Sequence, residues 1–541
     1  MKSFKLDKFL GVNKTDNPQD LPSFECTDLQ NVRITLEKIL KRAGTTAVGD
    51  IGNNSVRSLQ SVRGILVATH GTICEKLVGS TWTAMNLTGI NGTNKTHFIE
   101  FPVAVAKGSP VSATITGISN NGLTITASGA SWTPNAYVGD IARLSGQTTG
   151  AKQFRKIVLN TATTLTLSES LNTNTDADNT VHIEDPTDAT YFFNGEAPKT
   201  NVLASLATTW TAFVNTGWIF QYVAVYKSRI VGVKASSHKL YVSPLLIGED
   251  FPYEFEVAPG TKDYITGIAV FGDQLIIHKG DSGVWIAEAE DSDNAGAVFN
   301  FTQRAESNGA LSQESIAVGE NIMFYTSTRG IEWFNPLEVN ELEGHMALSD
   351  YKVPAVRGNG ASTDIGFVFD AKYFCYINST VYIFDIARYI DLRDRGVSNP
   401  YPFLIDSGYT PTSFAALSGT LYIGAASDVF SHTGTTDNTV AITSYWEKQG
   451  ITFKEPSRMK VLKKLACLHS GGTTSDNIAI TVTTDKETSA LDTMTFAKDF
   501  EVVGGKRQKG RTFKVKFDIT NIGTGSLESA ELIAEVGKIV V

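Results

Sequence analysis

A short strand-turn-strand phrase recurs along this chain and constrains its fold more than any other feature. Each copy places a two-residue polar turn between two runs rich in Val, Ile, Tyr and Phe, which is typical of a β-hairpin. The copies span 225–233, 270–278, 318–325, 369–376 and 417–424, and successive copies lie 45, 48, 52 and 47 residues apart. This period is typical of β-propeller blades, small sheets that bury their faces only against copies of themselves. The sequence therefore predicts a β-propeller of six, seven or eight blades.

The composition changes between residues 105 and 186, where Thr, Ser, Ala, Gly and Asn dominate. Short alternating runs in this stretch, such as 111–116 and 164–167, predict a small inserted β-barrel. The flanking runs 97–101 and 190–195 resemble two strands of one interrupted blade. An insertion at an exposed loop tip is tolerated because the two ends of the loop already lie close together.

The hairpin phrase stops after about residue 442, where longer alternating strands follow at 460–465, 478–482, 513–517 and 532–536. Their spacing favours a C-terminal β-sandwich. We therefore expect an all-β chain in four parts. These parts are an N-terminal docking segment with the first blades (1–104), the inserted β-barrel (105–186), the remaining blades (187–441) and the C-terminal β-sandwich (442–541).

The net charge of −9 is unevenly distributed. Between residues 446 and 516 there are 14 Lys or Arg against 8 Asp or Glu, a local balance of +6, which leaves the rest of the chain at −15. Four of these cations, Lys506, Arg507, Lys509 and Arg511, fall at one Gly-flanked hairpin tip. They belong either to a solvated sheet face or to a docking face for an acidic partner.

Two further groups of charges are candidate assembly contacts. Lys41 and Arg42 belong to the N-terminal segment and either hold the subunit against a neighbour or lie on a solvated strand edge. Arg393, Asp394 and Arg395 are expected in an exposed loop, where they form either a solvated cluster or an ion-pair patch between subunits. Exposed ion pairs of this type add little stability by themselves.

The search for chemistry predicts no catalytic residue, no metal site and no cofactor. The chain has no nucleophile elbow, no zinc-protease motif and no phosphate-binding loop, and its four Cys form no C-x-x-C pair. His278 and His345 are candidate acid-base groups, but a lone His beside a strand is more often structural. The N-terminus lacks the apolar core of a signal peptide, and no run is long enough to span a membrane.

The N-terminal segment is similar to the opening of the tail nozzle proteins of short-tailed bacteriophages. That family of podovirus proteins is also called tubular tail protein B or, in a related branch, tail-stabilisation protein. The similarity is carried by the runs 9–13, 20–22, 28–32 and 40–45, with Ala43 where the family often has Pro. A second stretch, within 274–334, resembles the propeller core of the same family.

The resemblance implies a structural virion protein that forms a homohexameric tube in the tail. Such a tube lies below the tail adaptor on the portal side, contacts the tail fibres, closes the DNA channel and opens for genome ejection. The protein would be synthesised in the cytoplasm of the host bacterium. Packaged double-stranded DNA would pass through the lumen without sequence-specific binding, and an acidic main body suits this role because it supplies few cations to hold phosphates.

Two other classes remain open from the residues alone. A receptor-binding or carbohydrate-binding propeller of a phage tail predicts exposed aromatic residues, such as Trp132, Trp210 or Trp218, clustered on one loop face. A glycan-cleaving propeller predicts two carboxylates within about 10 Å of each other in a central pocket.

Overall fold

The regular structure of this chain is almost entirely β. The computed structural model describes residues 1–541 except 8, 36–37, 53–54, 146–152, 172–179, 203–205, 207–209, 214–216, 293–295, 306–307, 320, 336–344, 348–352, 354–355, 357, 398–400, 427, 472, 474–475, 487, 496–499, 505–507, 521–524 and 537–541. Apart from helix α3 (Ile386–Asp394) and short 3-10 turns, the regular elements in these residues are β-strands.

In the described residues, six four-stranded antiparallel sheets and one group of four strands from a nine-stranded sheet make up seven groups. In chain order they are β6 (Val56–Val62), β7 (Ile65–His70), β8 (Ile73–Val78) and β9 (Thr81–Ala84); β10 (His97–Thr114), β16 (Thr180–Phe193), β17 (Lys199–Asn201) and β18 (Thr211–Ala212); β19 (Tyr222–Tyr226), β20 (Arg229–Val233), β21 (Lys239–Val242) and β22 (Tyr253–Glu256); β23 (Gly267–Phe271), β24 (Gln274–His278), β25 (Val284–Ser292) and β26 (Gly296–Ala305); β27 (Ala317–Gly319), β28 (Ile322–Ser327), β29 (Gly330–Phe334) and β30 (His345–Ala347); β31 (Ile365–Phe369), β32 (Lys372–Ile377), β33 (Thr380–Asp385) and β34 (Phe403–Asp406); and β35 (Ser413–Leu417), β36 (Thr420–Gly424), β37 (Val429–Ser431) and β5 (Thr46–Ala47).

A hairpin lies at each of the five predicted copies of the phrase, so this prediction is confirmed. In the hairpins that turn at 227–228, 370–371 and 418–419, both turn residues have positive φ. Turns of this type match the right-handed twist of the flanking strands. A further hairpin of the same kind joins β6 to β7 through Arg63 and Gly64.

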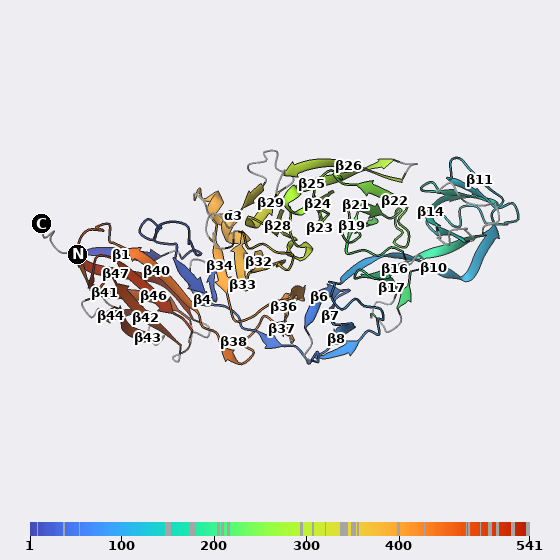
Figure 1. Cartoon of the computed structure of the whole chain (residues 1–541). Helices are drawn as coiled ribbons and strands as arrows, with labels where there is room; N and C mark the ends of the chain where they lie inside the picture. Colours follow the sequence, from blue (N-terminus) through green and yellow to red (C-terminus); the bar gives the residue numbers. More distant parts are fainter. Residues whose placement is uncertain are drawn as a thin grey trace.

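The seven groups lie around a common centre (Figure 1). The first strand of each group lies toward this centre, and most of these inner strands contact the inner strand of the next group. Strand β35 of the last group contacts β6 of the first. The outer strand of the last group is β5, which comes from the N-terminal part of the chain. Two distant parts of the sequence therefore meet where the circle closes.

The insertion is formed by strands that continue outward from the second group. Strands β10 and β16 leave the circle together, and β16 then pairs with β13 (Ile141–Ser145). The pairing continues through β14 (Gln153–Asn160), β15 (Thr164–Leu167), β12 (Thr124–Thr126) and β11 (Gly117–Ser119). A separate apolar core fills this unit, with Ile125, Leu144 and Ile157 fully buried. The pairings in the described residues form an open path and not a closed barrel.

Two sheets at the other end of the molecule share one apolar core. One sheet contains β1 (Lys2–Asp7), β3 (Val32–Thr35), β4 (Lys38–Lys41), β41 (Lys460–Ser470), β44 (Phe500–Gly504), β45 (Lys509–Gly510) and β47 (Ser526–Val536). The other contains β2 (Asp28–Gln30), β40 (Tyr445–Ile451), β42 (Asn477–Thr484), β43 (Thr488–Thr495) and β46 (Phe513–Asp518). A short hairpin of β38 (Thr436–Asp437) and β39 (Val440–Ala441) precedes them.

The N-terminal strands differ from the expected division of the chain. Residues 2–41 were expected in one part with the first blades, but β1, β2 and β4 pair with the C-terminal strands, and β3 joins the same sheet through β4. Lys2 lies opposite Ala534, and Leu29 lies opposite Trp446. The C-terminal unit is therefore completed by the first strands of the chain.

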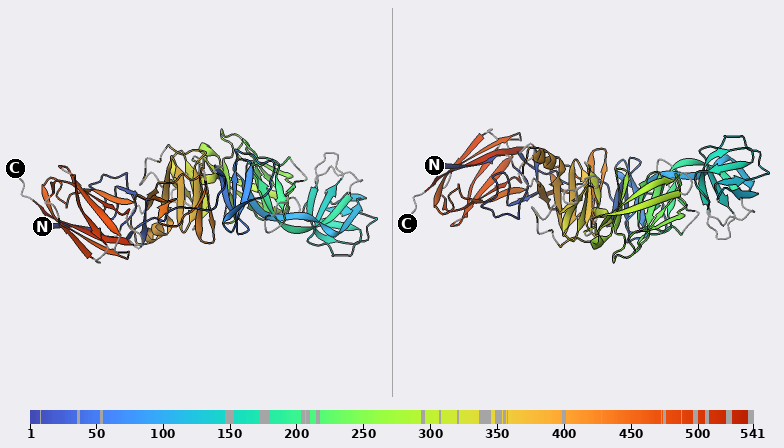
Figure 2. Two further views of the ribbon diagram at one scale, coloured as in Figure 1. Left: turned by 90° about the horizontal axis from the view of Figure 1, so that it is seen from below. Right: turned by 90° about the horizontal axis from the view of Figure 1, so that it is seen from above.

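The three units lie in a row (Figures 1 and 2). The two-sheet unit, which contains the first strand β1 and the last strand β47, lies at one end, the circle of four-stranded groups lies in the middle, and the insertion lies at the other end. Within the described residues, no helix has the length and apolar character that crossing a membrane would require.

Candidate functional site

The segment that resembles the phage family, residues 9–45, lies between the two-sheet unit and the circle. Val12 bridges both Cys26 and Phe403 of β34, and Phe9 packs edge-on against the buried ring of Trp446, with ring centroids 5.1 Å apart. The backbone N–H of Asn31 donates to the carbonyl of Ile405 at 2.8 Å. This segment therefore forms the joint between the two units.

A buried charge network lies at the centre of this joint. Arg42 is fully buried, and its Nε donates to Asn31 Oδ1 at 2.9 Å. Its two terminal nitrogens pair with both carboxylate oxygens of Asp437, and one of them also donates to the Ser407 carbonyl at 2.7 Å. The guanidinium also lies 5.1 Å from the centre of the Tyr409 ring. Every donor group of Arg42 is thus directed to this chain.

A second ion pair, Arg33 with Asp406, lies beside the Arg42–Asp437 pair. Arg33 donates two hydrogen bonds to Asp406, at 2.7 and 2.6 Å. Burial by itself would raise the pKa of Asp406, but the Arg33 guanidinium, with a contribution from Arg42, holds this pKa below its ordinary value. Burial, reinforced by Arg33 and Arg42, lowers the pKa of the nearby His432 to about 4.

The structure corrects the predicted assembly contact at Arg42. Arg42 is an interior residue and is not accessible to another subunit. Lys41 is half-buried on β4, where its Nζ donates to the Thr520 carbonyl at 2.9 Å. The charged run in this part of the sequence suggested a surface, but its partners lie hundreds of residues away and enclose it.

The cluster Arg393, Asp394 and Arg395 is exposed, as expected, but it ends a helix and does not form a loop. Helix α3 begins at the Asp385 cap, whose side chain accepts from Arg388 N at 3.0 Å. Arg393 pairs with Asp394 at 3.4 Å. All three side chains are more than half exposed, so they remain accessible to a partner.

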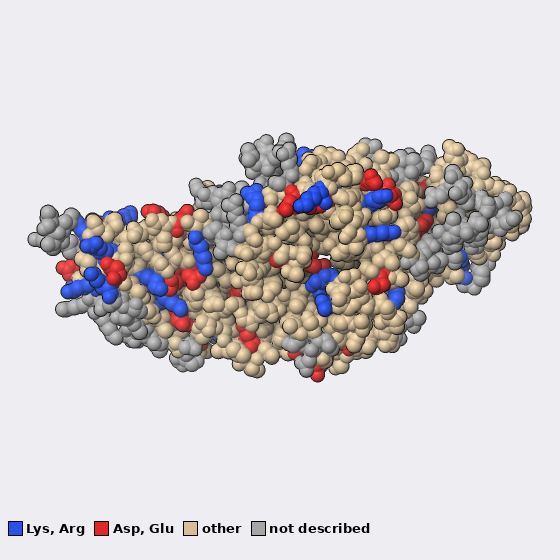
Figure 3. Space-filling view, in the orientation of Figure 1, with Lys and Arg blue, Asp and Glu red and all other residues tan. Residues whose placement is uncertain are grey.

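The basic hairpin tip of the C-terminal unit is described only in part. Lys509 and Arg511 are exposed, while Lys506 and Arg507 lie outside the described residues. Not every cation of this region lies on the surface, because Lys460 is buried and its Nζ donates to the carbonyls of Glu455, Arg458 and Arg511. Basic side chains gather over this end of the molecule, mixed with acidic ones (Figure 3).

The insertion is also joined to the circle by buried ion pairs. Glu169 follows β15 and accepts from Arg229 of β20 at 2.6 Å, from the Tyr253 hydroxyl at 2.6 Å and from the backbone N–H of Leu245 at 3.1 Å. Arg155 of β14 lies 3.5 Å from Asp250. Burial raises the pKa of Asp250.

Two adjoining cavities, of about 240 and about 480 Å³, lie at the middle of the circle. Their walls come from the residues that begin the inner strands β6, β10, β19, β31 and β35, and from the 3-10 turn Gln313–Ser315 before β27. They share the lining residues Asn94, Lys95, Gln221, Ser362 and Thr363. The face seen in Figure 3 is hollowed at this point, with acidic and basic side chains at the hollow.

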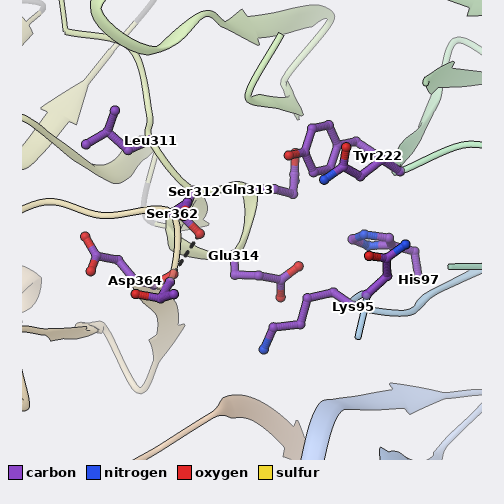
Figure 4. Close-up of a pocket in the computed structure, with 12 residues that line it drawn as sticks. Lys95, His97, Tyr222, Leu311, Ser312, Gln313, Glu314, Ser362 and Asp364 are labelled. Carbon is purple, nitrogen blue, oxygen red and sulfur yellow. Dashed lines mark hydrogen bonds between the residues drawn. The ribbon is translucent and has the colours of Figure 1, made fainter. Parts of the chain in front are cut away.

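Charged groups face one another across the smaller cavity. Figure 4 shows the Glu314 carboxylate directed toward Lys95 and His97, whereas the Asp364 carboxylate is directed away from Glu314. Lys95 Nζ donates to the carbonyls of Arg57 and Thr412, both at 2.6 Å. Burial lowers the pKa values of Lys95 and His97, and it raises the pKa of Asp364, whose carboxylate accepts from Ala361 N at 2.9 Å.

The two histidines named from the sequence do not form a catalytic pair in the described structure. His278 is fully buried, accepts from Ala310 N at 3.1 Å through Nδ1 and lies edge-on to Tyr325. These contacts give it a structural role. The side chain of His345 lies outside the described residues.

Sequence reasoning missed the central cavity. Its polar residues come from six separate segments, and none of those segments carries a motif. The available signal was weak: polar residues stand immediately before several of the predicted inner strands, where a propeller channel opens.

Comparisons with known proteins give no family for this chain. No family model matches it, and no curated protein matches it. A crystal structure of the computationally designed Ika8 protein is similar over 71% of this chain and 99% of that chain, with 10% sequence identity and a TM-score of 0.32. A similarity of that size carries no argument about fold or function.

Proposed function

We propose that the seven four-stranded groups are the blades of a seven-bladed β-propeller. Support comes from the common centre, the contact of β35 with β6 and the origin of β5 in the opposite end of the chain. Because β5, from the N-terminal part of the chain, completes the last blade, that blade closes the circle. In the same proposal, the two-sheet unit is a β-sandwich.

We further propose that the protein is a structural subunit of the tail nozzle of a short-tailed bacteriophage, acting without catalysis. One observation carries this proposal: separate pieces of the family-like phrase meet in one buried network. Asn31, from the run 28–32, accepts from Arg42, from the run 40–45, and both contact residue 407 of the circle. Two of the four runs therefore belong to one structural network, which supports treating the resemblance as a family feature.

The proposed assembly is a homohexamer that contacts the tail adaptor and fibres and closes the DNA channel until ejection. The accessible members of the predicted contact set, Arg393, Asp394, Arg395, Lys509 and Arg511, are the side chains we assign to such contacts. The elongated row of units gives one chain several separate surfaces for different neighbours.

The two competing functions receive less support. Trp132, Trp210 and Trp218 pack against three different apolar clusters and do not form one exposed aromatic face. Glu314 and Asp364 both line the central cavity, but their carboxylates do not converge in Figure 4. A glycosidase needs its two carboxylates on either side of one bond.

The test is the mass of the purified protein in solution, measured by light scattering, alone and with phage tail extract. A six-fold assembly in either condition supports the nozzle. A monomer in both conditions contradicts it and calls for a glycan-binding screen. Reversing both charges in Arg393→Glu/Arg395→Glu should weaken a hexamer, while Lys227→Glu, at an exposed hairpin turn, serves as the matched control.

A further inference from the structure

The central cavity contains opposite charges that are not paired with each other. Among the described residues, Glu314 has neither a hydrogen bond nor an ion pair, and no ion pair joins it to Lys95. Electrostatic coupling nevertheless links Glu314 to Lys95, His97 and Tyr222, so these groups face the same space. The Glu314 carboxylate is therefore free to accept hydrogen bonds from a ligand in the cavity.

The cationic side chains of the cavity also have hydrogen-bond donors without partners. Two of the three N–H donors of Lys95 bind backbone carbonyls, which leaves one donor. Arg57 lines the adjoining cavity, and its Nε is buried with no hydrogen-bond partner. Lys95 Nζ lies 2.6 Å from the backbone carbonyl oxygen of Arg57, so the Lys95 ammonium group lies beside the Arg57 backbone. The cavity thus presents an acceptor on one wall and cationic donors on another.

The other lining groups are small and polar. Gln221, Ser362 and Thr363 are shared by both cavities, and the Tyr222 ring lines the smaller one. Glu314 lines the smaller cavity of about 240 Å³ and Arg57 lines the adjoining cavity of about 480 Å³, so an occupant that meets both groups lies where the two cavities join. Because the walls carry both signs of charge, the occupant must be polar and close to neutral overall.

We propose that this cavity binds a free amino acid as a zwitterion, with its ammonium group on Glu314 and its carboxylate between Lys95 and Arg57. Charge-assisted hydrogen bonds at both ends would satisfy the groups that the chain leaves unpaired. A neutral polyol offers hydroxyls but no charge to either wall. A simple anion would leave Glu314 unpaired, and a simple cation would leave Arg57 unpaired. This binding function is independent of the nozzle assembly.

The test is isothermal titration calorimetry of the full chain with each of the twenty standard L-amino acids. We expect at least one to bind with a stoichiometry of one per chain. For that amino acid, its amide, which lacks the carboxylate, and its N-acetyl form, which lacks the ammonium, should each bind about 10- to 100-fold more weakly. Binding of D-glucose in place of any amino acid would overturn the proposal in favour of a polyol site.

Variants separate a local site from a general effect. Glu314→Gln and Arg57→Gln should each weaken binding about 10- to 100-fold. Glu256→Gln, on the exposed strand β22, should leave it unchanged. Thermal melts of each variant show whether the fold is retained. Binding that is insensitive to both cavity variants, or no binding by any of the twenty amino acids, would refute the assignment.

Discussion

Asp437→Asn tests the structural logic of the joint between the two-sheet unit and the circle. The substitution keeps the size of the side chain and removes its negative charge. In the structure, both oxygens of Asp437 accept from the Arg42 guanidinium, and Thr45 donates to one of them at 3.3 Å. Because Arg42 is fully buried, the variant leaves a charged group without its counter-ion inside the protein.

The magnitude follows from the surroundings of Arg42. Removing one partner of a buried ion pair costs about 3–5 kcal/mol. Here part of that cost is offset, since Asp406 lies 3.9 Å from Arg42 and the new amide oxygen still accepts one hydrogen bond. We therefore expect a loss of about 2–4 kcal/mol in the free energy of opening the joint.

Hydrogen exchange measured by mass spectrometry is the suitable assay because it reports local opening in a protein with several units. At about 1.36 kcal/mol per factor of ten, amide exchange in peptides covering 28–47 and 428–442 should accelerate about 30- to 1,000-fold. Peptides of the insertion should not change. Asp185→Asn is the control, since that carboxylate is 52% exposed and pairs with Lys107 at the surface. Exchange within about threefold of the parent protein would refute our account of the buried charge.

Three further predictions concern other parts of the chain. The pKa of His432 is about 4 in the folded state and about 6.5 when unfolded, so only the unfolded chain gains this proton as the pH falls between those values. The joint should therefore lose about 3 kcal/mol between pH 6.5 and pH 4 and nothing above pH 6.5, and urea titrations of the parent and of His432→Gln measure the difference. Glu169→Gln breaks the buried ion pair between the insertion and the circle and should cost about 3–5 kcal/mol of stability. Hydrogen exchange should become faster on both sides of that boundary. The control Glu254→Gln changes an exposed ion-pair residue and should cost less than about 1 kcal/mol. Ala371→Gly removes the side chain from a residue with a φ of 51° and should stabilise the chain by about 1 kcal/mol in urea titrations. The control Ala224→Gly, in the extended strand β19, should destabilise the chain by about 0.5–1 kcal/mol. A loss of stability in Ala371→Gly would contradict the turn geometry.

The hairpins were predictable from the sequence because their determinants are local. A two-residue turn at positive φ and the apolar alternation beside it lie within ten residues, as at 369–376. The insertion was predictable for a similar reason, since its composition changes abruptly at each boundary.

The joint and the cavity were not predictable because their determinants are distant. Arg42 pairs with Asp437, which lies 395 residues further along the chain, and the sequence around Arg42 does not indicate that partner. Its placement in a short charged run suggested a surface edge. The cavity wall likewise requires the circle to close before residues such as Lys95 and Glu314 face one another. The local sequence pattern predicts the individual sheets, but it does not predict how one sheet packs against another.

The joint between the two-sheet unit and the circle and the joint between the circle and the insertion both contain a buried ion pair. This shared chemistry determines how the chain would behave in an assembly. Each joint places a buried arginine against a carboxylate at the boundary between units: Arg42 with Asp437, and Arg229 with Glu169. A buried ion pair adds little net stability over an apolar contact, but breaking it is costly, and the planar guanidinium fixes the direction of approach. The joints therefore define the orientation of the units. A force applied to the insertion would be carried into the circle and on to the two-sheet unit, which would suit the tail subunit proposed above.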